Sequence, residues 1–283
     1  MRSHPLVSII IPTYKRQDAL SRAIASALNQ TYKNVEILIS DDEKSAETKA
    51  IVESIAKNDD RVKYIENYRS KGVSGARNSG IFIAKGEYCV FLDDDDEIMP
   101  EAVELFVNNT PKDAAFGYGW RRFCVAGDRS DIHKHGEKMD FDYLSKRGSN
   151  AAGPNIFVPK SHLIKIDGYD ESMPTSEDYD LCLRLLRHFG YAKGIEKVIA
   201  NYHDYSSDRL TKDRLKCYKG MRSIALKHGK EFTQKARALY LYRARRNYYG
   251  INPCRAFAWL PIGKALDELR RYLKYKLFGV KIK

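Results

Sequence analysis

Cysteine is scarce in this chain of 283 residues, and its spacing argues against the usual cysteine-based sites. The five cysteines are scattered, odd in number and without a Cys-x-x-Cys pair: Cys89, Cys124, Cys182, Cys217 and Cys254. This usage argues against a disulfide framework and against structural zinc, and it is typical of a reducing compartment.

Long apolar runs are absent as well. No window reaches the roughly eighteen apolar residues that a membrane-spanning helix needs, so we expect no segment that crosses a bilayer. The first five residues lead directly into a short strand-like run, without the apolar stretch of a signal peptide. We therefore expect a cytoplasmic protein.

Acidic residues become rare toward the C-terminus. Residues 212–283 contain 20 Lys and Arg against 4 Asp and Glu, whereas residues 1–211 contain 29 against 33. This division indicates a mildly acidic body over residues 1–211, which suits a catalytic domain that relies on a metal, and a basic extension over 212–283. Such an extension suits a phosphate-rich surface, either anionic lipid or nucleic acid.

The first hundred residues alternate between strand and helix patterns. Strands are expected at Leu6–Ile11, Val35–Ile39, Val62–Ile65 and Tyr88–Leu92, and helices at a segment capped by Asp18, at Ser45–Lys57 and at Val73–Ala84. This order predicts an α/β fold with a parallel sheet that is covered by helices on both faces. Ligands bind such sheets beyond the carboxyl ends of the strands.

Five consecutive acids, Asp93 to Glu97, follow the apolar strand that begins at Tyr88. Carboxylates this close repel one another and raise one another's pKa unless a cation lies among them. A hard divalent ion, Mg²⁺ or Mn²⁺, suits such oxygen ligands. The alternative is a solvated acidic loop.

Two further polar groups end strands at the same predicted edge. Pro12-Thr13-Tyr14 ends the first strand and Asp41-Asp42 ends the second. Each group alone has an ordinary explanation, a turn or a helix cap, but their convergence with the acidic run indicates a site.

A set of motifs in fixed order extends this pattern. The motifs are Val7-Ser-Ile-Ile-Ile-Pro-Thr-Tyr-Lys-Arg16, Ile39-Ser-Asp-Asp42, Gly75-Ala-Arg-Asn78 with Gly80, Gly86-Glu-Tyr88 before Phe91-Leu-Asp-Asp-Asp-Asp96, and Ser176-Glu-Asp178. From about residue 5 to 210 the chain resembles the family-2 glycosyltransferases of the GT-A fold, which use nucleotide-sugar donors and invert the anomeric centre. The resemblance implies a Rossmann-like, mostly parallel sheet flanked by helices. Its nucleotide-binding half would be residues 1–110 and its acceptor half residues 111–211, followed by the helical extension.

The resemblance also implies roles for the donor-site residues. Tyr14 would place its ring against the nucleobase, and Asp42 would accept the N3–H of uracil or thymine. Pro12 and Thr13 would supply backbone contacts, and Arg77 would hold ribose or diphosphate, unless it is an ordinary surface arginine. UDP is favoured over dTDP only by its frequency in the family.

The metal and the leaving group are assigned in the same way. Asp93-x-Asp95 matches the family's metal motif, with Asp95 as the direct ligand of Mn²⁺ or Mg²⁺ and Asp93 nearer the ribose. Asp94 and Asp96 would support the metal or contact the sugar. A bound cation stabilises the charge on the departing diphosphate.

The remaining half of the chemistry needs a base for the acceptor hydroxyl. The resemblance assigns this role to Asp178, with Glu177 as an acceptor or sugar contact. Both acids fall in the first turn of a helix that Thr175 or Ser176 can cap, so dipole complementarity is the alternative explanation. Trp120 would face the acceptor or pack in the core. His203 would lie near the metal and diphosphate or have a purely structural role.

The extension carries Ala236, Leu239 and Tyr240 at helical spacing, with basic and aromatic residues interleaved over 212–283. We expect it to lie on an anionic membrane surface or to pack on the catalytic domain. The first option fits an enzyme at the inner face of the cell membrane whose acceptor is a glycan, in bacterial relatives a lipid-diphosphate-linked one for surface polysaccharide. No Gln-x-x-Arg-Trp motif is present, which argues against a processive synthase.

Two other classes of protein fit part of the sequence. A sugar nucleotidyltransferase also uses carboxylates and a metal, but it should carry a Gly-rich loop after the first strand, where this chain has Pro-Thr-Tyr-Lys-Arg. A nucleic-acid or other polyanion binder explains the basic extension but leaves the aligned acids unexplained, so nucleic acid is not the expected partner.

Overall fold

The computed structural model describes residues 4–125, 129–147, 153–203 and 213–249, together with Leu266. The chain forms two compact units. Unit 1 spans Met1–Phe141, Ala151–Glu171 and Asp178–Tyr205, and unit 2 spans Asp142–Asn150, Ser172–Glu177 and Ser206–Lys283. The residues after 249 that entered the membrane hypothesis lie outside the described residues, except for Leu266.

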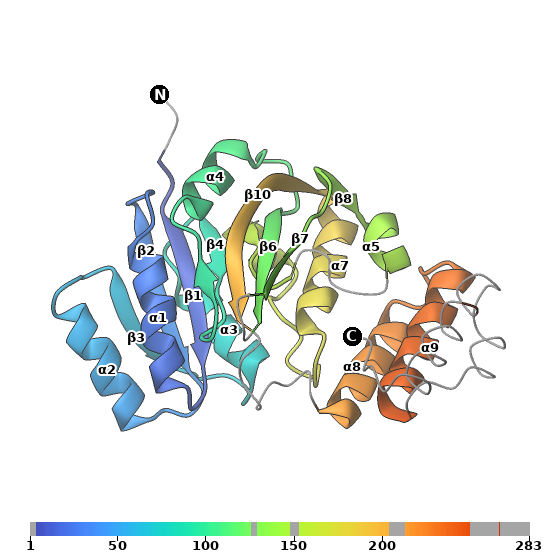
Figure 1. Cartoon of the computed structure of the whole chain (residues 1–283), viewed down its shortest axis with the longest axis horizontal. Helices are drawn as coiled ribbons and strands as arrows, with labels where there is room; N and C mark the ends of the chain where they lie inside the picture. Colours follow the sequence, from blue (N-terminus) through green and yellow to red (C-terminus); the bar gives the residue numbers. More distant parts are fainter. Residues whose placement is uncertain (1–3, 126–128, 148–152, 204–212, 250–265, 267–283) are drawn as a thin grey trace. The chain divides into compact units, whose positions relative to one another are not determined.

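Unit 1 is built on one mixed sheet (Figure 1). Its strands are β1 Val7–Thr13, β2 Val35–Asp41, β3 Val62–Glu66, β4 Tyr88–Phe91, β5 Glu97–Ile98, β6 Gly117–Val125, β7 Arg129–His133, β8 Lys138–Asp140, β9 Phe157–Pro159 and β10 Tyr191–His203. The order is β3-β2-β1-β4-β9-β6-β10-β5, with β7 beside β6 and β8 beside β10. The first four strands of this order are parallel, which confirms the predicted α/β class.

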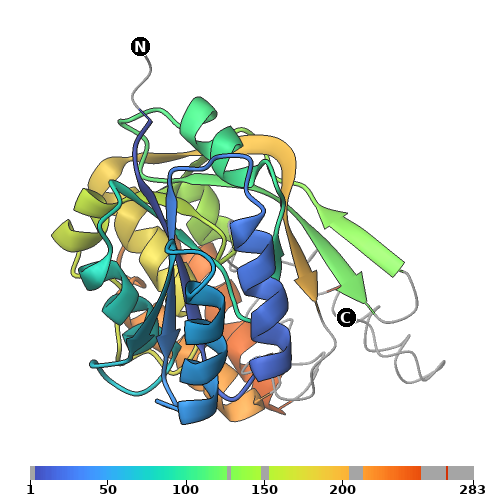
Figure 2. The same ribbon diagram turned by 90° about the vertical axis from the view of Figure 1, so that its left-hand side faces the viewer.

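Strand β1 lies at the centre of the parallel half and is buried along its whole length. Ile9 and Ile11 pack in one core cluster with Leu20 of helix α1 (Gln17–Leu28). Ile10 points to the opposite face, where a Cβ on Gly80 of α3 (Val73–Ile83) would lie 2.5 Å from the Ile10 Cγ2. Gly80 therefore lets α3 approach the sheet closely, and helices cover both faces (Figure 2).

The helix starts differ in one respect from the sequence prediction. Helix α2 (Ala46–Ala56) is capped by Ser45, whose Oγ accepts a hydrogen bond from the amide of Thr48 at 3.3 Å. The expected cap at Asp18 is wrong: α1 begins after Arg16, and Asp18 is the second residue of the helix. The carbonyl of Arg16 already accepts from the amide of Leu20, so Asp18 contributes its charge to the first turn.

The second half of the sheet contains most of the antiparallel pairs. Strand β9 is antiparallel to β4, and β10 is parallel to β6 with two register shifts between Ile195 and Ala200. Strand β6 runs from Gly117 to Val125, so Trp120 lies inside it. After α3 the chain also forms helices α4 Ala102–Asn109, α5 Phe141–Arg147, α6 Lys160–Lys165 and α7 Glu177–Phe189.

Unit 2 contains α8 (Arg214–Lys227) and α9 (Gln234–Tyr249). Asp213 caps α8 by accepting from the amides of Leu215 and Lys216, both at 3.0 Å. Three residues that the sequence suggested for a lipid surface, Ala236, Leu239 and Tyr240, are buried. Across the described parts of the chain, every helix is too short or too polar to span a bilayer.

Candidate active site

The carboxyl ends of three parallel strands bring the predicted groups together. Strand β1 lies between β2 and β4, which places a topological switch point beside Thr13. The amide of Asp42 donates to the carbonyl of Thr13 at 2.9 Å. The Thr13 hydroxyl donates to Asp94 Oδ2, also at 2.9 Å. The convergence expected at this edge is therefore present.

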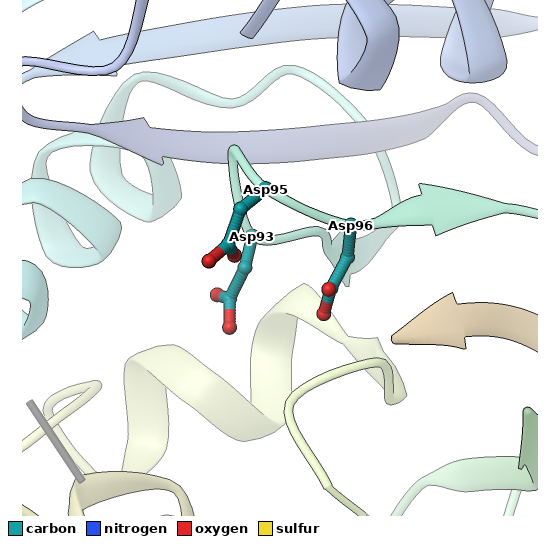
Figure 3. Close-up of side chains that lie close together, drawn as sticks. All are labelled: Asp93, Asp95 and Asp96. Carbon is teal, nitrogen blue, oxygen red and sulfur yellow. The ribbon is translucent and has the colours of Figure 1, made fainter. Parts of the chain in front are cut away.

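The acidic run forms a compact turn after β4. One carboxylate oxygen from each of Asp93, Asp95 and Asp96 lies within 4.8 Å of the others, and the three side chains point to the same side of the turn (Figure 3). Asp96 is fully buried and Asp95 is nearly so. Oxygen ligands in this number and spacing fit Mn²⁺ or Mg²⁺ by their chemistry.

Arg16 neutralises part of this turn. Its Nη1 lies 3.1 Å from Asp94 Oδ1 and 2.8 Å from Asp95 Oδ2. Burial raises the pKa of Asp94 to about 6, although Arg16 and the Thr13 hydroxyl act in the opposite direction. The repulsion inferred from the sequence is thus partly offset by an arginine of the chain itself.

Arg77 forms the second cationic contact of the turn. It lies in the first half of α3, is 2% exposed, and donates from Nη2 to Asp93 Oδ1 at 2.7 Å. Its Nη1 lies 3.0 Å from Asp178 Oδ1, and its guanidinium carbon is 5.0 Å from the centre of the Tyr169 ring. The alternative that Arg77 is a surface arginine is wrong.

The two candidate acids of α7 occupy the start of that helix, as predicted. Asp178 is the second residue of α7 and belongs to unit 1, where it meets Arg77. Ser176, directly before the helix, has a left-handed backbone with φ of 65°. Glu177 is the first residue of the helix, is buried, and belongs to unit 2.

The residues expected at the nucleobase lie beside the strand ends. Tyr14 is 41% exposed, with the ammonium groups of Lys15 and Lys71 at 5.3 and 5.4 Å from the centre of its ring. Asp42 accepts from the amide of Gly72 at 3.0 Å and from Asn67 Nδ2 at 2.6 Å. Pro12 is buried inside β1, next to Thr13 at the end of the strand.

His203 and Trp120 have different surroundings. His203 ends β10, where its amide donates to Asp96 Oδ1 at 3.0 Å and its Nε2 lies 2.5 Å from Glu97 Oε2. The chain therefore returns to the acidic turn at this residue. The Trp120 indole donates to the carbonyl of His135 at 3.0 Å, with Lys134 Nζ 5.0 Å from its ring centre. These contacts tie Trp120 to the segment after β7.

Two cations were not assigned from the sequence. In the sequence Arg16 was noted only as part of a motif. Its position shortly after the end of an apolar strand could have indicated that it lies at the ligand-binding edge of the sheet. Arg121, on β6, is 7% exposed and lies where a Cβ on Gly153 would come within 2.1 Å of its Nη1. Burial lowers the pKa of Arg121, while Tyr202, Asp96 and Asp178 raise it. A buried charged residue within a strand, such as Arg121, is a candidate for a functional site.

Among the solved structures with the same fold are two at low sequence identity. Residues 1–349 of TarS from S. aureus, crystallised with UDP-GlcNAc, superpose with a TM-score of 0.66 at 16% identity, covering 95% of this chain and 81% of that one. The mannosyltransferase PcManGT from Pyrobaculum calidifontis, in complex with GDP-Man and Mn²⁺, gives a TM-score of 0.61 at 14% identity, with 97% and 81% covered.

Sequence relatives are closer. A Campylobacter jejuni protein named GalNAc(5)-diNAcBac-PP-undecaprenol beta-1,3-glucosyltransferase is 41% identical over 232 residues, which is 78% of this chain and 73% of the relative. The putative colanic acid biosynthesis glycosyl transferase WcaA of Escherichia coli is 28% identical over 247 residues, 86% and 88% of the two chains. The sequence model of Glycosyl transferase family 2 matches residues 8–166. The chain is therefore a member of glycosyl transferase family 2, with the GT-A fold that its sequence predicts.

Proposed function

We propose that this enzyme transfers a sugar from a UDP-linked donor to a hydroxyl of a lipid-diphosphate-linked glycan, with inversion, in bacterial surface polysaccharide synthesis. The observation that carries the proposal is the double contact of Arg77, with Asp93 on one side and Asp178 on the other. One guanidinium thus links the acidic turn, suited to a donor diphosphate and its metal, to a carboxylate suited to an acceptor hydroxyl.

The donor side follows from the strand ends. The exposed ring of Tyr14 offers a surface for a pyrimidine base, and Asp42 offers an acceptor for its N3–H. UDP is supported by the TarS complex with UDP-GlcNAc, and by an E. coli relative, 48% identical over 91 residues, named as a UDP-Glc-using beta-1,3-glucosyltransferase.

The residues that would hold a divalent ion are Asp93 and Asp95, with Asp96 beside them. Bound Mn²⁺ or Mg²⁺ supplies positive charge to the leaving diphosphate. The PcManGT structure, which is a complex with GDP-Man and Mn²⁺, supports this choice. Asp94, tied to Thr13 and Arg16, holds the turn against the end of β1.

The acceptor side centres on Asp178. Its carboxylate accepts the proton of the acceptor hydroxyl as the oxygen attacks the anomeric carbon. Arg77 fixes the orientation of that carboxylate, which favours productive geometry before attack. Attack on the face opposite the leaving diphosphate inverts the anomeric centre. Trp120 and His203 are proposed to contact the acceptor or sugar, and Glu177 directly precedes Asp178 in the sequence.

The acceptor class comes from the relatives. Both the Campylobacter protein and the E. coli beta-1,3-glucosyltransferase carry names that specify undecaprenol diphosphate-linked sugars. An acceptor of that class would place this enzyme at the inner face of the cell membrane.

Donor binding tests the proposal first. Thermal unfolding would be followed with UDP, dTDP, GDP, CDP and ADP, each with and without Mn²⁺. UDP with metal should give the largest shift, about 2.7 kcal/mol of stabilisation at one hundred times the dissociation constant. Asp95→Ala should remove the metal-dependent shift, while Asp60→Ala, an exposed acid before β3, should keep it. The absence of a shift with every nucleotide would refute the donor site.

A further inference from the structure

Helix α8 of unit 2 has two unlike sides. Gly220, Ile224 and Ala225 are buried. On the opposite side, residues at i, i+4, i+7 and i+11 form one line along the helix: Leu215, Lys219, Arg222 and Leu226. Leu215 is 43% exposed and Leu226 is 61% exposed. We call these four residues the α8 stripe.

The charge around the α8 stripe has a single sign. Residues 214–230 contain six basic side chains and no acidic one: Arg214, Lys216, Lys219, Arg222, Lys227 and Lys230. The acid directly before them, Asp213, is engaged with the first amides of the helix. This part of the surface therefore presents exposed leucines among basic side chains.

Single exposed leucines are ordinary on protein surfaces. Two exposed leucines in one line, with Lys219 and Arg222 between them, combine apolar and basic side chains on the same exposed side of the helix. The leucines can enter the boundary of the acyl chains while the long basic side chains reach the lipid phosphates. A nucleic acid would be matched better by aromatic rings on the stripe, and none of its four residues is aromatic.

We propose that the α8 stripe docks unit 2 on an anionic bilayer. The inference rests on the proposed lipid-linked acceptor for its purpose, but it concerns a different surface from the active site. It also revises the sequence-based hypothesis, because the exposed face of α8 replaces the buried α9 residues as the lipid contact. Binding to vesicles requires neither donor nor acceptor, so its failure is distinguishable from a failure of sugar transfer.

Co-sedimentation of the full chain with vesicles tests the proposal. The vesicles would be phosphatidylcholine alone or phosphatidylcholine with phosphatidylglycerol. The chain should bind only the anionic vesicles, and less at high salt. The double variants Leu215→Gln with Leu226→Gln, and Lys219→Gln with Arg222→Gln, should each weaken binding about tenfold or more.

Matched controls come from unit 1. Ile83→Gln with Ile164→Gln removes two residues that are each 45% exposed, and Lys57→Gln with Lys112→Gln removes two exposed charges. Both controls should bind vesicles as the wild type does. Circular dichroism and UDP binding should be unchanged in the stripe variants, because the α8 stripe takes no part in donor binding.

A gain of signal completes the test. Leu226→Trp should show blue-shifted fluorescence with anionic vesicles, while Ile164→Trp should not respond. No vesicle binding by the wild type, unchanged binding by both stripe variants, or retention on RNA in place of vesicles would overturn the proposal. Unchanged fluorescence of the Leu226→Trp variant while it is bound to anionic vesicles would overturn the proposal as well.

Discussion

Arg77 and Asp178 form a largely buried ion pair, with 3.0 Å between Nη1 and Oδ1. The same guanidinium donates to Asp93 at 2.7 Å, so α3 links the acidic turn after β4 to the start of α7. Arg77 and Asp178 are far apart in the sequence. Their contact unites the two halves of the proposed chemistry in one structural unit.

Loss of this link should destabilise the fold. Arg77→Met removes a 2% exposed guanidinium and leaves Asp93 and Asp178 without it, which should lower the free energy of unfolding by about 3 to 5 kcal/mol. Urea denaturation measures the change. The matched control is Arg61→Met, which breaks a more exposed pair with Asp59 and should cost less than about 1 kcal/mol. Equal losses in the free energy of unfolding for the two variants would show that the Arg77 contacts stabilise the fold no more than an exposed ion pair does.

Gly153 should tolerate no side chain. Its φ is 69°, and an added Cβ would lie 2.1 Å from Arg121 Nη1, so Gly153→Ala combines backbone strain with displacement of a buried cation. We expect a loss of at least about 2 kcal/mol in thermal or urea unfolding.

Two other glycines allow the effect of backbone strain to be separated from the effect of steric overlap. Gly190 has a φ of 90° with open space around its Cβ position, so Gly190→Ala should cost about 1 to 2 kcal/mol from strain alone. Gly136 has open space without the unusual φ, so Gly136→Ala should be nearly neutral. If Gly153→Ala lowered the free energy of unfolding no more than Gly190→Ala does, the close approach of Gly153 to Arg121 would not contribute to the loss of stability.

Glu171 should contribute stability that depends on pH. Burial alone would raise its pKa, but hydrogen bonds from Asn78, Arg69 and Ser70 lower the pKa of Glu171 from 4.5 to about 2. A carboxyl group with a lowered folded-state pKa stabilises the fold above its unfolded pKa, and this contribution is lost as the pH falls toward the folded value.

The comparison of wild type with Glu171→Gln checks this sign. The wild type should be the more stable protein above about pH 5, and its advantage should shrink as the pH falls toward about 2. Urea denaturation across this range gives the difference directly. An advantage that stayed constant, or that grew in acid, would contradict the assignment.

The parallel half of the fold was readable from the sequence, because β1 and β2 are buried on both faces. Continuous apolar runs such as Leu6–Ile11 and Val35–Ile39 predicted β1 and β2 within a residue at their starts. Strand β5 is two residues long, so it has no periodicity to detect. Its conformation follows from the strand beside it.

The acidic residues of the candidate site could be predicted from the sequence, but its arginines were harder to predict. Asp93 to Asp96 and Asp178 stand out because charge follows an apolar strand or begins a helix. The partners of Arg16 and Arg77 lie far away along the chain, so only the fold reveals that these arginines meet the acids. The α8 stripe was missed for a related reason: the buried side of α8 is small, and only its packing shows which leucines face outward.

The central claim is that Asp178 is the base, and the variant Asp178→Asn tests it most directly. Transfer from UDP-sugars to a lipid-diphosphate-linked acceptor would be measured beside UDP binding in the presence of Mn²⁺. Asp18→Asn is the control, since Asp18 is the second residue of α1 as Asp178 is of α7. We predict unchanged UDP binding with transfer reduced by about 10² to 10⁴-fold in Asp178→Asn, and normal transfer in the control. Full transfer by Asp178→Asn would contradict the account.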